Sequence, residues 1–174
     1  MGEGLSRVAV ADAGPLIHLY EIRRLQLLSI AFTSILVPQA VCDEAIAAGR
    51  MSELELIEAA KLQRYAVTPE QLAQTAALPE AAGLHRGELE CLALCRATST
   101  NLLLTDDLAA RDAAKRLGLL PVGSLGVIIK VYHGSHLSLQ DAEQAIQDLH
   151  IASSLFVTSA IVELAIAALR TLKP

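Results

Sequence analysis

The chain is poor in aromatic residues and contains no long hydrophobic run. Its 174 residues include no tryptophan, two phenylalanines and three tyrosines, although 53% of the residues are hydrophobic. Most of that content is alanine, leucine, isoleucine and valine, which suits a helix-rich α/β core. No apolar stretch approaches the roughly 20 residues that a transmembrane helix needs, because Thr158, Ser159 and Glu163 interrupt the longest candidate. The composition therefore predicts one domain that does not span a membrane.

The chain has an odd number of cysteines and no signal peptide pattern. Cys42, Cys91 and Cys95 cannot all pair, and the first residues have an early acid and no apolar core of a signal peptide. These features predict a reduced, cytoplasmic protein. Cys91 and Cys95 have the spacing of a metal pair on a helix, but their apolar neighbours and the lack of a nearby third ligand favour core cysteines.

An excess of basic residues is absent as well. The formal net charge is −5, whereas domains that bind nucleic acid without specificity are usually basic. An acidic chain can still be an enzyme that meets nucleic acid through a local patch or a bound cation.

Short apolar stretches alternate with helix-like patterns through most of the chain. We expect strands near residues 7–11, 34–38, 63–69, 101–105 and 119–124, and closing helices at 125–134, 138–150 and 158–172. This alternation predicts a helix-rich α/β domain with a parallel sheet covered on both faces. We expect one domain over residues 1–174, with the helices from about 136 to 174 as an appended element.

Two acids directly follow predicted strands. Asp12 ends the first strand, and Asp106 follows the most apolar one. Sites in parallel sheets lie at the carboxyl ends of strands, so we expect these acids to be neighbours in space. Gly14 can cap the first helix, and Asp107 is the natural cap of the helix that follows it. A role as a turn residue or helix cap therefore stays open for Asp12, whereas the Asp107 cap leaves Asp106 without a structural explanation.

Two glutamates are further candidates. Glu44 lies beside Asp43 on a predicted helix, and the pair alone does not say which acid points inward. Glu88 occupies the first turn of its helix, where the helix dipole alone can explain a carboxylate. Glu90 is expected to face solvent. Converging carboxylates repel each other unless they are protonated or neutralised, and Mg²⁺ or Mn²⁺ would neutralise them and be shared with a substrate phosphate.

Four segments, in this order and spacing, resemble the motifs of the PIN-domain family: "VAVADAGPLIHL", "VPQAVCDEAI", "HRGELECLALC" and "NLLLTDDLAARDAAKRLG". The nearest subgroup is the bacterial and archaeal PIN-like proteins related to the VapC toxins of toxin–antitoxin pairs. The resemblance covers nearly the whole chain. It implies a PIN-like α/β/α sandwich around a central parallel sheet of short strands. It also implies a ribonuclease that hydrolyses RNA phosphodiester bonds with Mg²⁺ or Mn²⁺.

The resemblance assigns a role to each acid. Asp12, Glu44, Glu88 and Asp106 match the catalytic acids of the family. Asp12, Glu88 and Asp106 would hold the metal directly or through water, with Asp107 as an additional or substitute ligand. Glu44 would hold a second metal ion, or help to position and deprotonate the attacking water.

Several other side chains could support such a site. Thr105 matches the hydroxyl residue common before the fourth acid, where it could hydrogen-bond a site water or a carboxylate. Arg111 and Lys115 share one helix face and could contact phosphate, although an ordinary solvated face explains them equally well. His18 is expected to be a partly buried structural residue, and His85 is a weaker candidate for a phosphate contact.

The implied partners are an RNA substrate, an antitoxin protein as a candidate, and a second copy of the chain through the apolar C-terminal helices. Two alternatives stay open. One is a PIN-like module that binds nucleic acid or protein and cleaves weakly or not at all. The other is a phosphate-handling α/β protein, but a response-regulator receiver would carry its acid pair after the first strand, and here the pair comes late.

Overall fold

The computed structural model describes residues 8–47 and 51–171. Its elements follow in the order β1 (Val8–Ala11), α1 (Ala13–Glu21), α2 (Leu27–Ala31), β2 (Ser34–Pro38), α3 (Gln39–Ala47), α4 (Glu53–Ala60), β3 (Leu62–Tyr65), α5 (Pro69–Ala76), the 3₁₀ helix η1 (Pro79–Ala81), α6 (Arg86–Thr98), β4 (Leu102–Leu104), α7 (Leu108–Arg116), β5 (Leu120–Val122), α8 (Ser124–His133), α9 (Leu139–Ala152) and α10 (Ser159–Thr171).

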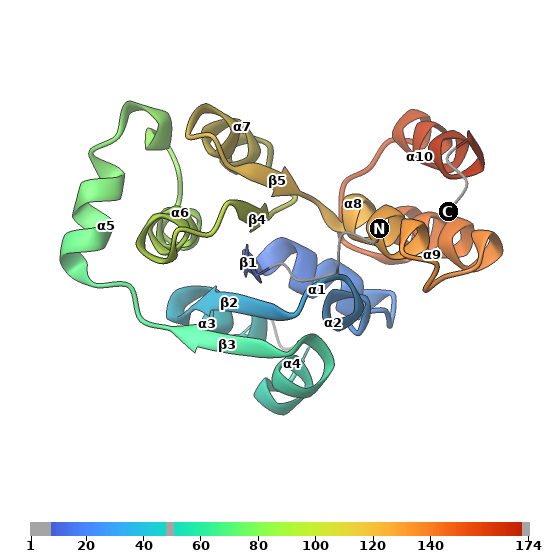
Figure 1. Ribbon diagram of the computed structural model, residues 1–174, viewed down its shortest axis with the longest axis horizontal. Coiled ribbons are helices and arrows are strands. Elements are labelled where there is room, and N and C mark those ends of the chain that lie inside the picture. The colour runs from blue at the N-terminus through green and yellow to red at the C-terminus, as the bar shows by residue number, and fades with distance from the viewer. Residues whose placement is uncertain (1–7, 48–50, 172–174) are drawn as a thin grey trace, which may run out of the picture.

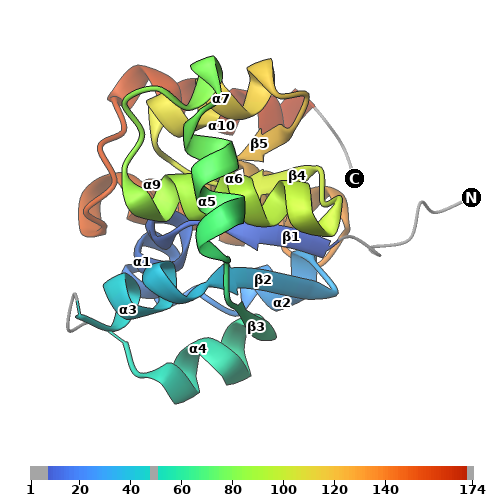
Figure 2. The same cartoon turned by 90° about the vertical axis from the view of Figure 1, so that its left-hand side faces the viewer.

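The five strands form one parallel sheet in the order β3-β2-β1-β4-β5. Strand β1 lies in the centre, where Val10 pairs with Leu36 of β2 and Leu103 of β4. Helices α2 and α8 lie on one side of the sheet, with α9 and α10 beyond α8 (Figure 1). Figure 2 looks onto the opposite side, where α6 covers the sheet and α5 lies outside α6. The predicted α/β/α fold with a central parallel sheet is confirmed.

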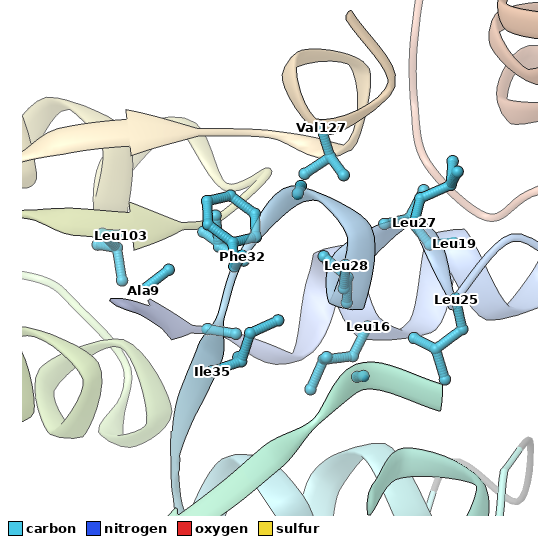
Figure 3. Packing of buried hydrophobic residues seen from close by; sticks show 14 of the residues in the cluster. Ala9, Leu16, Leu19, Leu25, Leu27, Leu28, Phe32, Ile35, Leu103 and Val127 are labelled. Atoms are coloured by element: carbon cyan, nitrogen blue, oxygen red, sulfur yellow. The ribbon is translucent and has the colours of Figure 1, made fainter. Parts of the chain in front are cut away.

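The core is built from small and branched aliphatic side chains rather than aromatic ones. Ala9 and Val10 of β1 are fully buried, and Leu28 of α2 packs with Phe32 and Ile35 (Figure 3). Burial of a side chain such as Leu28 stabilises the fold by about 1.5–3 kcal/mol. The sheet and its helices therefore form a fixed frame for the residues at the ends of the strands.

Polar residues set the helix boundaries along the chain. Ser52 and Glu55 form the capping box of α4 that their spacing indicates. Thr68 caps α5 in the same way, which ends the extended segment early. Strand β3 therefore covers Leu62–Tyr65 rather than the expected 63–69.

The closing helices differ in how deeply they are buried. Helix α9 buries Ala145, Ile146 and Leu149 completely against the core. Helix α10 buries Val162 and Leu169 only, and its Leu164 is 71% exposed. None of the helices in the described part of the chain is both long and apolar enough to cross a membrane.

Backbone hydrogen bonds join the carboxyl end of β4 to those of β1 and β5. The backbone N–H of Asp12 donates to the carbonyl of Leu104 at 2.9 Å, and the N–H of Thr105 donates to the carbonyl of Val122 at 3.0 Å. The residues that follow these strands are therefore held side by side, as the parallel sheet predicts.

Candidate functional site

Asp12 sits at the junction between β1 and α1. One carboxylate oxygen accepts a 2.8 Å hydrogen bond from the N–H of Ala13, and the other accepts a 3.0 Å bond from the Thr105 hydroxyl. Asp12 is therefore the N-cap of α1. The expectation that Gly14 serves as this cap is wrong, because the helix begins at Ala13 and the Asp12 side chain reaches its first N–H.

Thr105 connects Asp12 to Asp107. Its hydroxyl donates to Asp12 and accepts a 3.3 Å hydrogen bond from the N–H of Asp107. The Asp107 carboxylate accepts a 2.8 Å bond from the N–H of Ala110, which confirms the predicted cap of α7. One buried hydroxyl thus fixes two acids that follow different strands.

The two glutamates come from α3 and α6. Glu88 accepts a 2.8 Å hydrogen bond from the N–H of His85, so its side chain folds back over the start of α6. Glu44 lies on the exposed end of α3, and its Oε2 would be 3.5 Å from a β-carbon at Gly87. That distance is an ordinary contact, so α3 and α6 are neighbours at this point without requiring a glycine.

These side chains line one cavity of about 280 Å³. Its lining consists of Asp12, Ala13, Gly14, Glu44, His85, Gly87, Glu88 and Asp107. Helices α1, α6 and α7 all begin at this cavity. The positive ends of their dipoles favour anions there, which explains how four carboxylates can gather in a small space.

Asp106 does not line this cavity. Its Oδ1 accepts a 2.7 Å hydrogen bond from the N–H of Ser124. Its Oδ2 accepts a 2.6 Å bond from the Ser124 hydroxyl and lies 2.8 Å from Nδ1 of His18. The family resemblance assigned Asp106 to the metal site with Asp12 and Glu88, and named Asp107 as an additional or substitute ligand. In the structure, Asp107 lines the cavity with Asp12 and Glu88, whereas Asp106 is held against α1 and α8.

Gly123 leaves the space that Asp106 needs. A β-carbon at this position would lie 2.6 Å from Asp106 Oδ1 and 3.1 Å from Nη1 of Arg111. The φ angle of Gly123 is −92°, so crowding and not backbone strain requires the glycine. Sequence reasoning missed Gly123 and Ser124, because a glycine and a serine after a strand also occur in ordinary turns.

Burial raises the pKa of Asp12 to about 6, from an ordinary value of 3.8. The hydrogen bonds from Ala13 and Thr105 act in the opposite direction, and the charges of Glu88 and Glu44 raise the pKa further. The ionised carboxylate is therefore unfavourable where it stands. A cation in the cavity would remove that cost.

The cavity carries the carboxylate oxygens that a hard cation prefers, but they are not arranged as a complete set of metal ligands. Among the described residues, no three histidine, cysteine, aspartate or glutamate side chains converge closely enough to hold a metal ion. Asp12, Glu88 and Asp107 each accept a hydrogen bond from a backbone N–H at a helix start instead. Carboxylate oxygens are nevertheless the ligands that Mg²⁺ and Mn²⁺ prefer.

The remaining candidates lie around the site. Arg111 donates a 3.2 Å hydrogen bond to the carbonyl of Thr105, whereas Lys115 is exposed on the same helix. His85 lines the cavity. His18 is partly buried and contacts Asp106, as expected for a structural histidine.

Cys91, Cys95 and Glu90 of α6 lie outside the cavity lining. Cys91 and Cys95 are buried, and burial raises the pKa of the Cys95 thiol to about 12 and that of Cys91 well above its usual value. Both are therefore neutral core residues. The expectation that Glu90 faces solvent is wrong, because it is buried, bonded to Arg86 at 2.9 Å, and accepts from the N–H of Ala40 at 3.4 Å.

A family model described as a PIN domain matches residues 8–171, which is nearly the whole chain. No curated protein and no solved structure matches the chain. PIN domains are generally nucleases and typically use divalent metal ions. Since the match covers the sheet, the four acids and the closing helices together, the chain belongs to the PIN-domain family.

Proposed function

We propose that this protein is a metal-dependent endoribonuclease that hydrolyses RNA phosphodiester bonds. The observation that supports this best is the single cavity lined by Asp12, Glu44, Glu88 and Asp107. These acids come from four separate parts of the chain, and three of them sit at helix starts that face the cavity. A role at a helix start explains Asp12, Glu88 and Asp107 one by one, but it explains neither Glu44 nor the gathering of all four acids.

The cation that best fits is Mg²⁺ or Mn²⁺. Asp12, Glu88 and Asp107 would hold it, directly or through water, in exchange for their present backbone hydrogen bonds. A bound divalent ion supplies charge stabilisation for the cleaved phosphate and lowers the pKa of a water molecule. Asp106 would contribute through position, since its oxygens are already engaged by His18 and Ser124.

The chain's own residues would prepare the reaction. Thr105 holds Asp12 and the backbone of Asp107 in one arrangement. Glu44 makes no such contact and is exposed at the cavity, so it is free to orient and deprotonate the attacking water. Cleavage of this kind leaves a 3′-hydroxyl and a 5′-phosphate.

The experiment that tests this proposal compares RNA cleavage in Mg²⁺, in Mn²⁺ and in EDTA, on a panel of single-stranded and structured RNAs. We expect cleavage with either metal and none in EDTA. We expect Asp12→Asn and Glu44→Gln to lose at least about 100-fold in rate, the usual contribution of a positioned acid or base. Asp43→Asn is the matched control. Asp43 precedes Glu44 on α3, is exposed, and accepts a hydrogen bond from the side-chain amide of Gln39.

Equal cleavage in metal and in EDTA would contradict the proposal. Binding of RNA without cleavage in any metal would favour the alternative, a PIN-like binding module. Normal cleavage by Asp43→Asn would show that a substitution on α3 does not by itself abolish activity, so a loss in Glu44→Gln is specific to Glu44.

Three narrower statements extend the proposal. The protein would act as the toxin of a toxin–antitoxin pair in the cytoplasm, in which case its induced expression arrests growth and Asp12→Asn does not. An antitoxin protein would then relieve the arrest. A homodimer is favoured by the exposed apolar side chains of α10, Ile161 and Leu164, and sedimentation of the protein tests it.

A further inference from the structure

A second groove, of about 470 Å³, lies between the start of α7, the start of α8 and the segment before α10. Its walls are mostly apolar and include Leu125, Leu155 and Val157. Two cationic side chains, Arg111 and Lys130, line the same space. The cleavage site proposed above does not use this groove.

Phe156 is the most unusual residue of the groove. Its side chain is 91% exposed, more than any other large apolar side chain in the described residues. The chain has only two phenylalanines, and the other, Phe32, is buried. An exposed aromatic ring offers a flat apolar face on which a planar ligand can stack.

The two cations stand without a carboxylate partner. Within residues 8–47 and 51–171, neither Arg111 nor Lys130 forms an ion pair. Arg111 donates to the carbonyl of Thr105, and the Lys130 ammonium lies 5.8 Å from the centre of the Phe32 ring. The Asp106 carboxylate also lines the groove, but its oxygens are engaged by His18 and Ser124. In a chain of net charge −5, two cations without an ion pair in such a groove are suited to an anionic ligand.

The groove adjoins the acidic cavity. Asp107 lines the cavity and Asp106, the preceding residue, lines the groove. Arg111 lies one turn into the helix that Asp107 caps. Asp106 and Asp107 are consecutive residues, so a strand with a phosphate at the cavity would reach the groove by passing the start of α7.

We propose that this groove binds a nucleotide of single-stranded RNA next to the phosphate that is cleaved. The base would stack on Phe156 and pack against the aliphatic walls, while Arg111 and Lys130 contact the neighbouring phosphates. Base stacking on aromatic rings combined with cationic phosphate contacts is how proteins bind single strands with little sequence preference. This inference rests on the proposed ribonuclease activity and names where its substrate lies.

The test uses fluorescein-labelled 12-nucleotide oligouridylate and oligoadenylate, with binding measured by fluorescence anisotropy. The binding measurements are made in a Glu88→Gln background, so that cleavage does not consume the probe. We expect Phe156→Ala to weaken binding about tenfold. We expect Lys130→Gln to weaken it about threefold at low salt and to reduce the dependence on log[salt] by about 0.7.

Two variants serve as matched controls. Tyr65→Ala removes a half-exposed aromatic ring from the end of β3, at the opposite edge of the sheet. Lys61→Gln removes an exposed cation from the residue before the same strand. Neither should change the affinity. Phe156 is almost fully exposed, so its replacement should leave the thermal unfolding midpoint unchanged.

The outcomes separate this inference from the proposed function. Suppose that the unaltered protein cleaves RNA with metal, but Phe156→Ala and Lys130→Gln bind RNA with unchanged affinity. This result would show that the groove is not an RNA-binding site, and a protein partner would become the alternative occupant. The proposed function would then stand. If no RNA is bound or cleaved by the unaltered protein, both fail.

Discussion

Two adjacent aspartates after β4 occupy different environments, and the difference assigns them different tasks. Asp107 is exposed, caps α7 and lines the acidic cavity. The side chain of Asp106 is only 10% exposed, and its oxygens contact His18 and Ser124. The repulsion between two neighbouring carboxylates is relieved because they point to different partners. Substitution by asparagine should therefore separate a chemical role from a positioning role.

Asp107→Asn should lower RNA cleavage at least about 100-fold and leave the free energy of unfolding within about 0.5 kcal/mol, because asparagine caps helices as well as aspartate. Asp106→Asn should instead destabilise the fold by about 1–3 kcal/mol, because both carboxylate oxygens accept hydrogen bonds from Ser124 and an amide NH2 cannot accept one of them. Urea unfolding and initial cleavage rates measure the two effects. Asp112→Asn, exposed on the same helix, is the control. Equal unfolding energies for the two variants would contradict the assignment.

Asp12 gives a prediction about pH. Its pKa is about 6 in the folded protein against 3.8 ordinarily, so the unfolded chain releases this proton first as pH rises. The loss of folding free energy that comes from ionising the buried Asp12 is absent below about pH 4, grows between about pH 4 and 6, and is fully present above about pH 6. A rise of this size corresponds to at most about 3 kcal/mol.

In EDTA, Asp12→Asn should therefore stabilise the protein by about 1–3 kcal/mol at pH 7 and have little effect at pH 3.5. Urea unfolding at both pH values, with Asp43→Asn as the control, measures the difference. A destabilised Asp12→Asn variant at pH 7 would show that the hydrogen bonds of the carboxylate outweigh its burial.

Individual residues also show where sequence reasoning stops. The capping role of Asp107 and the core positions of Cys91 and Cys95 follow from spacing and apolar neighbours. The burial of Glu90 does not, because it depends on Arg86 and on the N–H of Ala40 from a distant helix. Which of two adjacent acids enters a cavity is likewise decided by contacts from other elements.

At the scale of elements, the start of α8 determines how the end of β4 is held. Gly123 and Ser124 receive the Asp106 carboxylate, and Asp106 in turn contacts α1 through His18. The segment between β4 and α7, which carries Thr105 and Asp107, is therefore fixed from two sides. A side chain that pushed Asp106 out of this position would move the acidic cavity as well.

Gly123→Ala should have this effect, because its β-carbon would lie 2.6 Å from Asp106 Oδ1. We expect a loss of about 1–3 kcal/mol in unfolding free energy and a larger loss in cleavage rate than stability alone explains. Gly14→Ala is a control for stability, since its β-carbon would meet Asp106 at an ordinary 3.6 Å. Urea unfolding and cleavage rates measure both variants. Normal stability in Gly123→Ala would show that Asp106 has room to move.

At the scale of the whole molecule, the parallel sheet brings distant residues together. Asp12 and Asp107 are far apart in sequence, yet β1 and β4 are neighbours, and both acids follow the carboxyl ends of their strands. Alternating apolar strands and helices predict this sheet from sequence, because strands buried on both faces are continuously apolar. The positions of α3 and α6, which bring Glu44 and Glu88 to the same cavity, depend on packing that no local pattern encodes.

The acidic cavity also predicts how the whole fold responds to metal. A ligand that binds only the folded state stabilises it by about 2.7 kcal/mol at a concentration 100 times its dissociation constant. For a chain of this size, that corresponds to a rise of roughly 5–10 °C in the unfolding midpoint. We therefore expect millimolar Mn²⁺ or Mg²⁺ to raise the midpoint of the unaltered protein and of Asp43→Asn. Asp12→Asn and Asp107→Asn should show little or no rise, because each removes a ligand. Differential scanning calorimetry in EDTA and in metal measures the shift without any RNA. A rise of equal size in Asp12→Asn, Asp107→Asn and the unaltered protein would place the bound cation outside the cavity.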